Sequence, residues 1–169
     1  EQFQTLWKAA YEKLPRDVEA KPPVDALVAE FAGTATVAGD VVTVAAKVRV
    51  EVLKEGWVEV PLRLAGAAIT KAAIDNEPAR ILARPGEGHM LLLEKQGKEP
   101  RLITLDLEFA KACVKAPGRN SVAFDSPSAP VNCWEVRVPE SGVKVEILPL
   151  LAATEVPPAP GVRETRLQA

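Results

Sequence analysis

His89 is the only imidazole in this sequence, so any histidine-based catalysis would have to use it. A Ser-His-Asp site would place His89 beside a serine such as Ser121 and a carboxylate such as Asp106. No serine stands in a Gly-x-Ser-x-Gly turn, the strained elbow that exposes a nucleophilic hydroxyl. Cys113 has no activating neighbour in the sequence either, and reactive thiols need one. We therefore expect no nucleophilic catalysis.

Two carboxylates, Asp106 and Glu108, alternate with apolar residues and should share one face of a strand. Paired carboxylates can perform the acid and base steps of glycoside hydrolysis. No aromatic residues surround this pair to hold a sugar ring. We interpret the two as solvated residues on the outer face of a sheet, and we expect no enzyme activity.

Metal and cofactor motifs are missing from the sequence. Cys113 and Cys133 do not have the two to four intervening residues of a zinc ligand pair, and they can form one disulfide in an oxidising compartment. The alternation around Cys133 points its side chain away from the face of Trp134, which argues against that bridge. Gly86 and Gly88 lack the third glycine and the lysine of a phosphate loop. We predict no metal and no cofactor.

The length and composition favour some classes of protein over others. The chain has 169 residues, a formal net charge of −2 and 47% hydrophobic residues, but only 5% aromatic residues. This length is typical of one domain, and the slightly acidic balance does not favour a nucleic-acid partner, which would need a basic surface. No run of about 18 apolar residues is present to span a membrane.

A helix is predicted at the start of the chain, over residues 1–15 and ended by Pro15. Apolar side chains recur there at helical spacing and share one face. So short a helix is marginal alone in water, so its apolar face must be covered. Either it docks on its own domain or it packs on a partner. The face consists of Phe3, Leu6, Trp7, Ala10, Tyr11 and Leu14.

After a proline-bearing connector over residues 16–24, the hydrophobic period changes from 3.6 to 2. Valines at positions 42, 44, 48, 50 and 52, with Ala46 in the same row, predict a strand with one dry face, and Ala38-Gly39-Asp40 predicts the hairpin turn before it. Short strands with turns at intervals of 8 to 12 residues follow, including one over 65–74, one near 122–124 and one over 143–148. We predict an all-β fold, an antiparallel β-sandwich of about 9–11 short strands, over residues 25–154.

Two tryptophans of the β-region have different expected roles. Trp134 is in phase with inward valines and should belong to the core, whereas Trp57 is out of phase with its inward neighbours and should face solvent. Pro61 marks its strand as an edge strand or the site of a bulge. The predicted interaction surface is therefore Trp57 together with five residues of the helix, Phe3, Leu6, Trp7, Tyr11 and Leu14.

The chain begins at Glu1, and residues 155–169 read as a proline-rich linker and the start of a following segment. We expect a longer parent chain. Four segments carry a resemblance: Gly56–Ala79, which opens with Gly-Trp-Val-Glu-Val-Pro-Leu, and Gly88–Leu93, Ser121–Phe124 and Ala129–Pro139. Over residues 31–153 the chain resembles β-rich modules near the start of large secreted or envelope proteins of environmental bacteria. It also has some likeness to the β-sandwich domains that lead extracellular peptidases and adhesins.

The resemblance implies a location outside the cytoplasm, in the periplasm, the envelope or the medium, and no known activity. The expected function is a non-catalytic structural or interaction module of a larger bacterial protein. Its expected partner is the rest of the parent chain or another protein. The alternative is a β-sandwich module that binds a carbohydrate or another ligand through Trp57.

Overall fold

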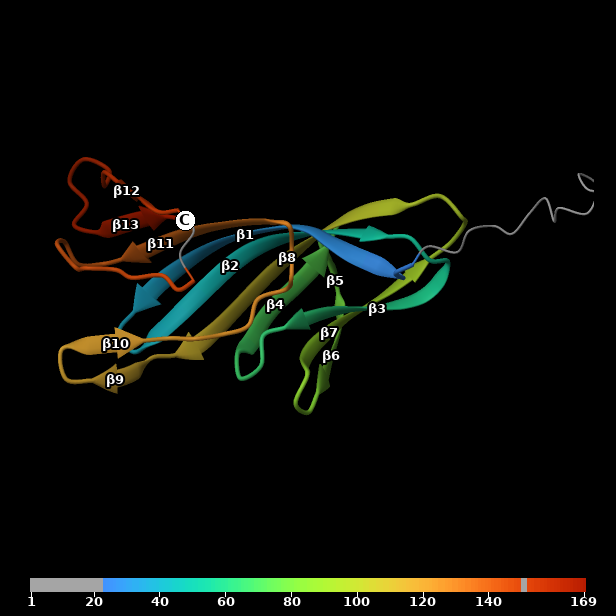
Figure 1. The fold of residues 1–169 in the computed structure, drawn as a ribbon, viewed down its shortest axis with the longest axis horizontal. Coiled ribbons are helices and arrows are strands. Elements are labelled where there is room, and N and C mark those ends of the chain that lie inside the picture. Colours follow the sequence, from blue (N-terminus) through green and yellow to red (C-terminus); the bar gives the residue numbers. More distant parts are fainter. Residues whose placement is uncertain (1–22, 150–151) are drawn as a thin grey trace, which may run out of the picture.

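The computed structural model describes residues 23–149 and 152–169, and these residues form thirteen strands and no helix (Figure 1). The predicted all-β class is confirmed for this part of the chain, whereas the helix predicted over residues 1–15 lies outside the described residues. The described part also lacks any helix with the length and apolarity that a membrane crossing requires. The strands are β1 (Ala26–Ala38), β2 (Val41–Val52), β3 (Gly56–Arg63), β4 (Ala68–Ile74), β5 (Glu77–Pro78), β6 (Arg80–Arg84), β7 (Gly88–Lys95), β8 (Arg101–Ala112), β9 (Val114–Ala116), β10 (Arg119–Ser121), β11 (Val131–Val138), β12 (Thr154–Val156) and β13 (Thr165–Gln168).

The strands make three sheets. The largest has eight strands in the order β12-β13-β11-β1-β2-β8-β4-β5, the second has the order β3-β7-β6, and β9 pairs with β10 alone. Strands β1 and β11 run parallel, so the prediction of a purely antiparallel arrangement is wrong at this pair. The residues between β10 and β11 return the chain to the far side of β1, which β11 then joins in the same direction (Figure 1). Alternation reports faces and carries no information about strand direction.

The three long strands β1, β2 and β8 form the centre of the eight-stranded sheet. Their alternating sequences give the sheet one buried face. In β2 the exposed and buried residues alternate strictly from Val41 to Val50. Gly39, with a φ of 61°, makes the turn that joins β1 to β2, as predicted.

One buried cluster joins the eight-stranded and three-stranded sheets. Val44 and Leu105 from the large sheet are completely buried, as are Leu62 and Leu91 from the small sheet. All four belong to the same hydrophobic cluster. Buried residues of the two sheets therefore contribute to one hydrophobic core.

Four aromatic rings fix β11 to this core. Phe31 and Trp134 have ring centroids 5.0 Å apart, Phe109 and Phe124 5.3 Å, and Phe124 and Trp134 5.5 Å. The prediction that Trp134 packs in the core is confirmed, since it lies against the cluster. Gly33 leaves the space for these rings, because a Cβ there would lie 3.0 Å from Phe31 and 3.1 Å from Trp134.

Several local predictions are confirmed and two are wrong. Pro61 lies in β3, an edge of the three-stranded sheet, and a register shift follows it. The strand predicted within 65–74 is β4. No strand forms at 122–124 or 143–148. Phe124 resembles an inward residue of a strand in the sequence, but its ring packs in the aromatic cluster from a segment that is not a strand.

Candidate interaction surface on the eight-stranded sheet

The outer face of the eight-stranded sheet is hollowed at its centre. Ala32 and Thr34 of β1 and Ala45 of β2 have short side chains on this face, and Thr34 lies directly opposite Ala45. They belong to the floor of a groove of about 1140 Å³. At these three positions the long side chains that would normally cover the outer face of a sheet are missing. The groove follows from small residues placed in register on adjacent strands.

Ion pairs occupy the side of the groove formed by β2, β8 and β4. Lys47 Nζ lies 3.9 Å from an Asp106 carboxylate oxygen, and Lys71 Nζ lies 3.4 Å from Glu108. The two carboxylates are on the outer face, as predicted, but each pairs with a lysine on the neighbouring strand. A glycosidase would need them to face one another across a substrate, so this arrangement does not suit that chemistry.

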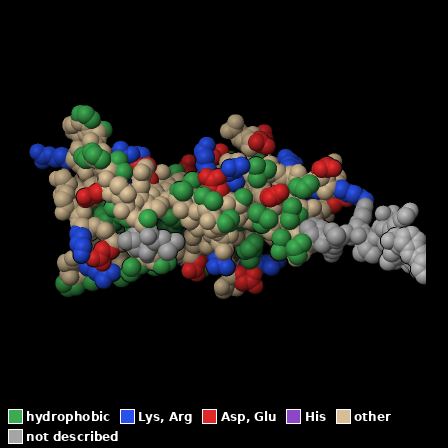
Figure 2. Space-filling model, turned by 45° about the horizontal axis from the view of Figure 1, so that its top comes forward, with side chains coloured by type: hydrophobic (Ala, Val, Ile, Leu, Met, Phe, Trp, Pro, Cys, Tyr) green, Lys and Arg blue, Asp and Glu red, His purple; other side chains and the backbone are tan. Residues whose placement is uncertain are grey.

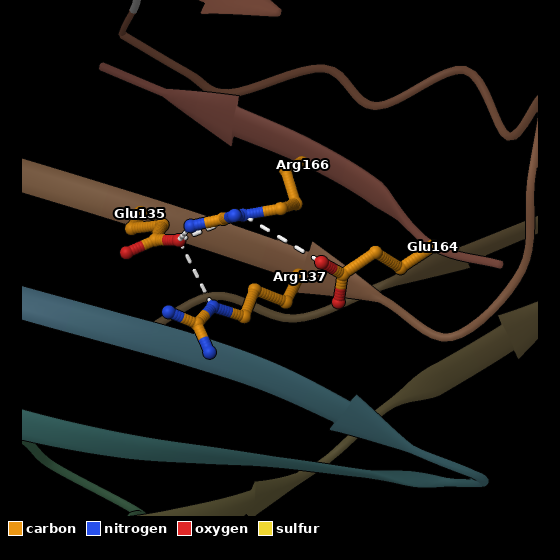
Figure 3. Close-up of polar contacts among 4 residues, drawn as sticks. All are labelled: Glu135, Arg137, Glu164 and Arg166. Atoms are coloured by element: carbon orange, nitrogen blue, oxygen red, sulfur yellow. Dashed lines mark hydrogen bonds and ion pairs between the residues drawn. The ribbon is translucent and has the colours of Figure 1, made fainter. Parts of the chain in front are cut away.

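A second charged cluster lies at the opposite side of the groove, where β11 meets β13 (Figure 3). Glu135 accepts hydrogen bonds from Arg137 Nε at 2.9 Å and from Arg166 Nε at 3.0 Å, and Arg166 Nη2 also bonds to it. These bonds, that of Arg137 first, lower the pKa of Glu135, and the same contact raises the pKa of Arg137. Glu164 lies 3.7 Å from Arg166. The cluster ties the C-terminal strand to the sheet and balances its own charge.

Trp57 lies on a different surface, the outer face of the three-stranded sheet. Its side chain points outward, as predicted, and the residue is 48% exposed. The Arg80 guanidinium lies 5.3 Å from the centre of the indole, within cation–π range. Arg84 donates a hydrogen bond of 2.7 Å to Glu59. Both contacts join the edge strands β3 and β6, so they pass over the outer side of the middle strand β7, where Met90 is only 8% exposed.

The other predicted surface residues, Phe3, Leu6, Trp7, Tyr11 and Leu14, lie outside the described residues. Trp57 is therefore one of several polar and aromatic side chains that lie over the outer side of β7. The outward direction of Trp57 could be predicted from the sequence, whereas its contact with Arg80 could not, because that contact depends on the order of strands in the small sheet.

The residues considered for catalysis are not brought together. His89 lies on β7 beside a cavity of about 320 Å³, where its Nδ1 is buried without a hydrogen-bond partner. Asp106 lies on β8 in the other sheet. Cys113 and Cys133 are free thiols, and Cys133 is exposed in the groove. Within residues 23–149 and 152–169, no three His, Cys, Asp or Glu residues approach closely enough to hold a metal ion.

The fold resembles part of several solved enzymes. No family model matches the chain, and no curated protein matches it. An M1 zinc metallopeptidase from Deinococcus radiodurans superposes with a TM-score of 0.54 at 14% sequence identity, over 85% of this chain and 39% of that one. A two-domain M1 zinc metallopeptidase variant bound to L-tryptophan gives 0.53 at 15% identity, over 85% and 39% of the two chains.

Native yeast LTA4 hydrolase gives a TM-score of 0.51 at 12% identity, over 85% of this chain and 26% of that one. At these identities the similarity extends to the fold alone. The chain therefore shares a β-sheet architecture with these enzymes and spans well under half of their length.

Proposed function

We propose that this chain is a non-catalytic interaction domain of a larger cell-envelope or secreted bacterial protein, and that the groove is its contact surface. We also infer that the two larger sheets form an open β-sandwich, because they share one buried cluster. The observation that carries the proposal is the floor of Ala32, Thr34 and Ala45. Short side chains let another element approach the sheet closely, whereas long polar ones keep it in water.

The electrostatics of the groove favour a protein partner over an ionic ligand. Lys47 pairs with Asp106, Lys71 with Glu108, and Glu135 with its arginines, so the positive and negative groups beside the floor are paired. A nucleic acid or a phosphate would need an excess of positive charge. A balanced rim with a small-residue floor suits the surface of another domain, on which both kinds of charge occur.

The solved structures of similar fold give independent support for a larger parent chain. Each is at least about 2.5 times as long as the matched segment, since 39% or less of it is covered. Two of these proteins are M1 zinc metallopeptidases, and that chemistry belongs to those proteins. In the proposed parent chain, this domain supplies a docking surface and no reacting group.

The test fills the groove with one side chain. Ala45→Arg places a long cation on the floor, and Thr43→Arg places the same cation two residues along β2, on the same face but outside the groove. Each variant is mixed with the remainder of the natural gene product, and binding is measured by calorimetry. We expect Ala45→Arg to weaken binding at least about tenfold and Thr43→Arg less than about twofold. Equal affinities for the two variants would refute the assignment of the groove.

A second candidate function is carbohydrate or other ligand binding through Trp57, whose indole is half exposed. Arg80 already lies against that ring, so a sugar would have to displace the guanidinium or stack on the remaining surface. A glycan array tests this directly. Binding that disappears in Trp57→Ala, and that persists in Ala45→Arg, would replace the first proposal with the second.

A further inference from the structure

A proline-rich loop joins β12 to β13, the last two strands of the eight-stranded sheet. Residues 157–163 are all exposed, and three of the first four are prolines, Pro157, Pro158 and Pro160. The loop lies at the left end of the molecule, where Figure 1 places β12 and β13. Hydrophobic side chains gather on the projection at this end (Figure 2). An exposed apolar loop is a candidate contact surface for another protein.

Both ends of the loop are held on the sheet. Val156, the last residue of β12, lies opposite Arg166 of β13 in the strand register. Arg166 Nε donates a hydrogen bond of 3.0 Å to Glu135 of β11. Thr165 is only 7% exposed, and its hydroxyl donates a hydrogen bond of 2.8 Å to the carbonyl oxygen of Glu140. The fold therefore presents the proline-rich loop from a fixed base.

The prolines restrict the backbone of this loop to the polyproline II conformation. Each proline ring holds φ near about −65°. A residue that precedes a proline is steered away from the helical region, and this applies to Val156, Pro157 and Ala159. The extended run ends in a turn, because Val162 N–H donates a hydrogen bond of 3.0 Å to the Ala159 carbonyl oxygen and Gly161 has a φ of 85°. Binding this segment therefore costs a partner little conformational entropy.

The spacing of the prolines gives the segment one distinctive side. Polyproline II has three residues per turn and rises about 3.1 Å per residue, so Pro157 and Pro160 lie on the same side, about 9 Å apart. The residues before them, Val156 and Ala159, are aligned in the same way. Pro158 projects to another side. Segments with prolines three residues apart dock in protein grooves that are lined by aromatic side chains.

The charge beside the loop adds a second requirement for the partner. Arg163 follows the turn, is exposed, and has no ion-pair partner among the described residues. We propose that residues 156–160 are a docking motif for a partner protein whose groove is lined by aromatic side chains and carries a carboxylate that pairs with Arg163. This inference does not depend on the proposed function, because no residue from 156 to 163 lines the groove of the eight-stranded sheet.

Competition for a polyproline-binding probe tests the proposal. The probe is an SH3 domain, whose groove combines aromatic and acidic side chains, with a fluorescent proline-rich peptide bound to it. We expect the chain to displace this peptide at concentrations below about 1 mM. Pro157→Ala and Pro160→Ala should each weaken displacement at least about fivefold, whereas the matched control Pro158→Ala should change it less than about twofold. Arg163→Gln should weaken displacement about threefold, as expected for an exposed ion pair.

Three results would overturn the proposal. The first is no displacement at about 1 mM of the chain. The second is an equal loss in Pro157→Ala, Pro158→Ala and Pro160→Ala, which would mean that no particular side of the segment is bound. The third is tighter binding by a free peptide of residues 153–164 than by the chain, which would mean that the fold does not present the motif. Thermal unfolding of each variant should be unchanged, and Ala45→Arg, in the separate groove, should displace the peptide as well as the original chain does.

Discussion

Gly88 is the position where a single added carbon should disturb the structure most sharply. It begins β7 with a φ of 86°, in the left-handed region. A Cβ built there would lie 1.9 Å from the carbonyl oxygen of Arg63 and 3.1 Å from the backbone nitrogen of Ala65. Both neighbours are backbone atoms, so no side chain can rotate away. The backbone between β3 and β4 passes directly against the start of β7.

The magnitude follows from comparison with Gly86, in the same turn. Gly86 has a φ of 81°, but a Cβ there would have nothing within 4 Å. Gly86→Ala should therefore cost only the left-handed conformation, about 1–2 kcal/mol of unfolding free energy. Gly88→Ala adds the overlap with the Arg63 carbonyl and should cost at least about 4 kcal/mol in total, in the exceptional range for one substitution.

Urea unfolding at neutral pH, followed by tryptophan fluorescence, measures both variants against the original chain. The expected result is a much lower urea midpoint for Gly88→Ala than for Gly86→Ala. If the two variants lost the same free energy, the close approach between β7 and the loop after β3 would be wrong. If Gly88→Ala fails to accumulate in cells while Gly86→Ala accumulates normally, the order of the two costs is supported.

Two further predictions concern charge and packing. Because hydrogen bonds from Arg137 and Arg166 lower the folded-state pKa of Glu135 below its ordinary value of 4.5, its stabilisation is complete above that value and is lost as pH falls through the folded pKa. The difference in urea midpoint between the original chain and Glu135→Gln should therefore be largest near about pH 6 and shrink toward about pH 3, and a constant difference would contradict this linkage. Leu105→Ala should cost about 2–5 kcal/mol because this side chain is fully buried, whereas Leu102→Ala at an exposed site should stay within about 0.5 kcal/mol in the same unfolding experiment, and equal losses would contradict the assigned core.

The strands themselves could be predicted because local alternation reports local structure. The valine row of β2 and the glycine turn before it were visible in the sequence, and so was the inward position of Trp134. The parallel pairing of β1 with β11 could not be predicted, since it depends on the path of the chain after β10. The strand near residues 122–124 was predicted wrongly, because a phenylalanine that packs in an aromatic cluster cannot be told from an inward strand residue in the sequence.

The groove was missed for a similar reason. Ala32, Thr34 and Ala45 each look like ordinary outward residues of a strand. They form a hollow only because β1 and β2 are neighbours in one register and β8 and β11 flank them. The usable signal was a run of small outward residues on two consecutive strands joined by a tight turn. Asp106 and Glu108 were placed on the correct face, but their lysine partners come from other strands.

The most direct test of the proposed docking surface uses the protein's own thiol. Cys133 is exposed and lines the groove, whereas Cys113 is half-buried and lies outside it. The rate of Cys133 alkylation by iodoacetamide is measured in the isolated chain and in the natural gene product, with Cys113 as the internal reference. We expect Cys133 to react at least about tenfold more slowly in the natural gene product, because a docked domain covers the groove. Equal rates in the two proteins would contradict it.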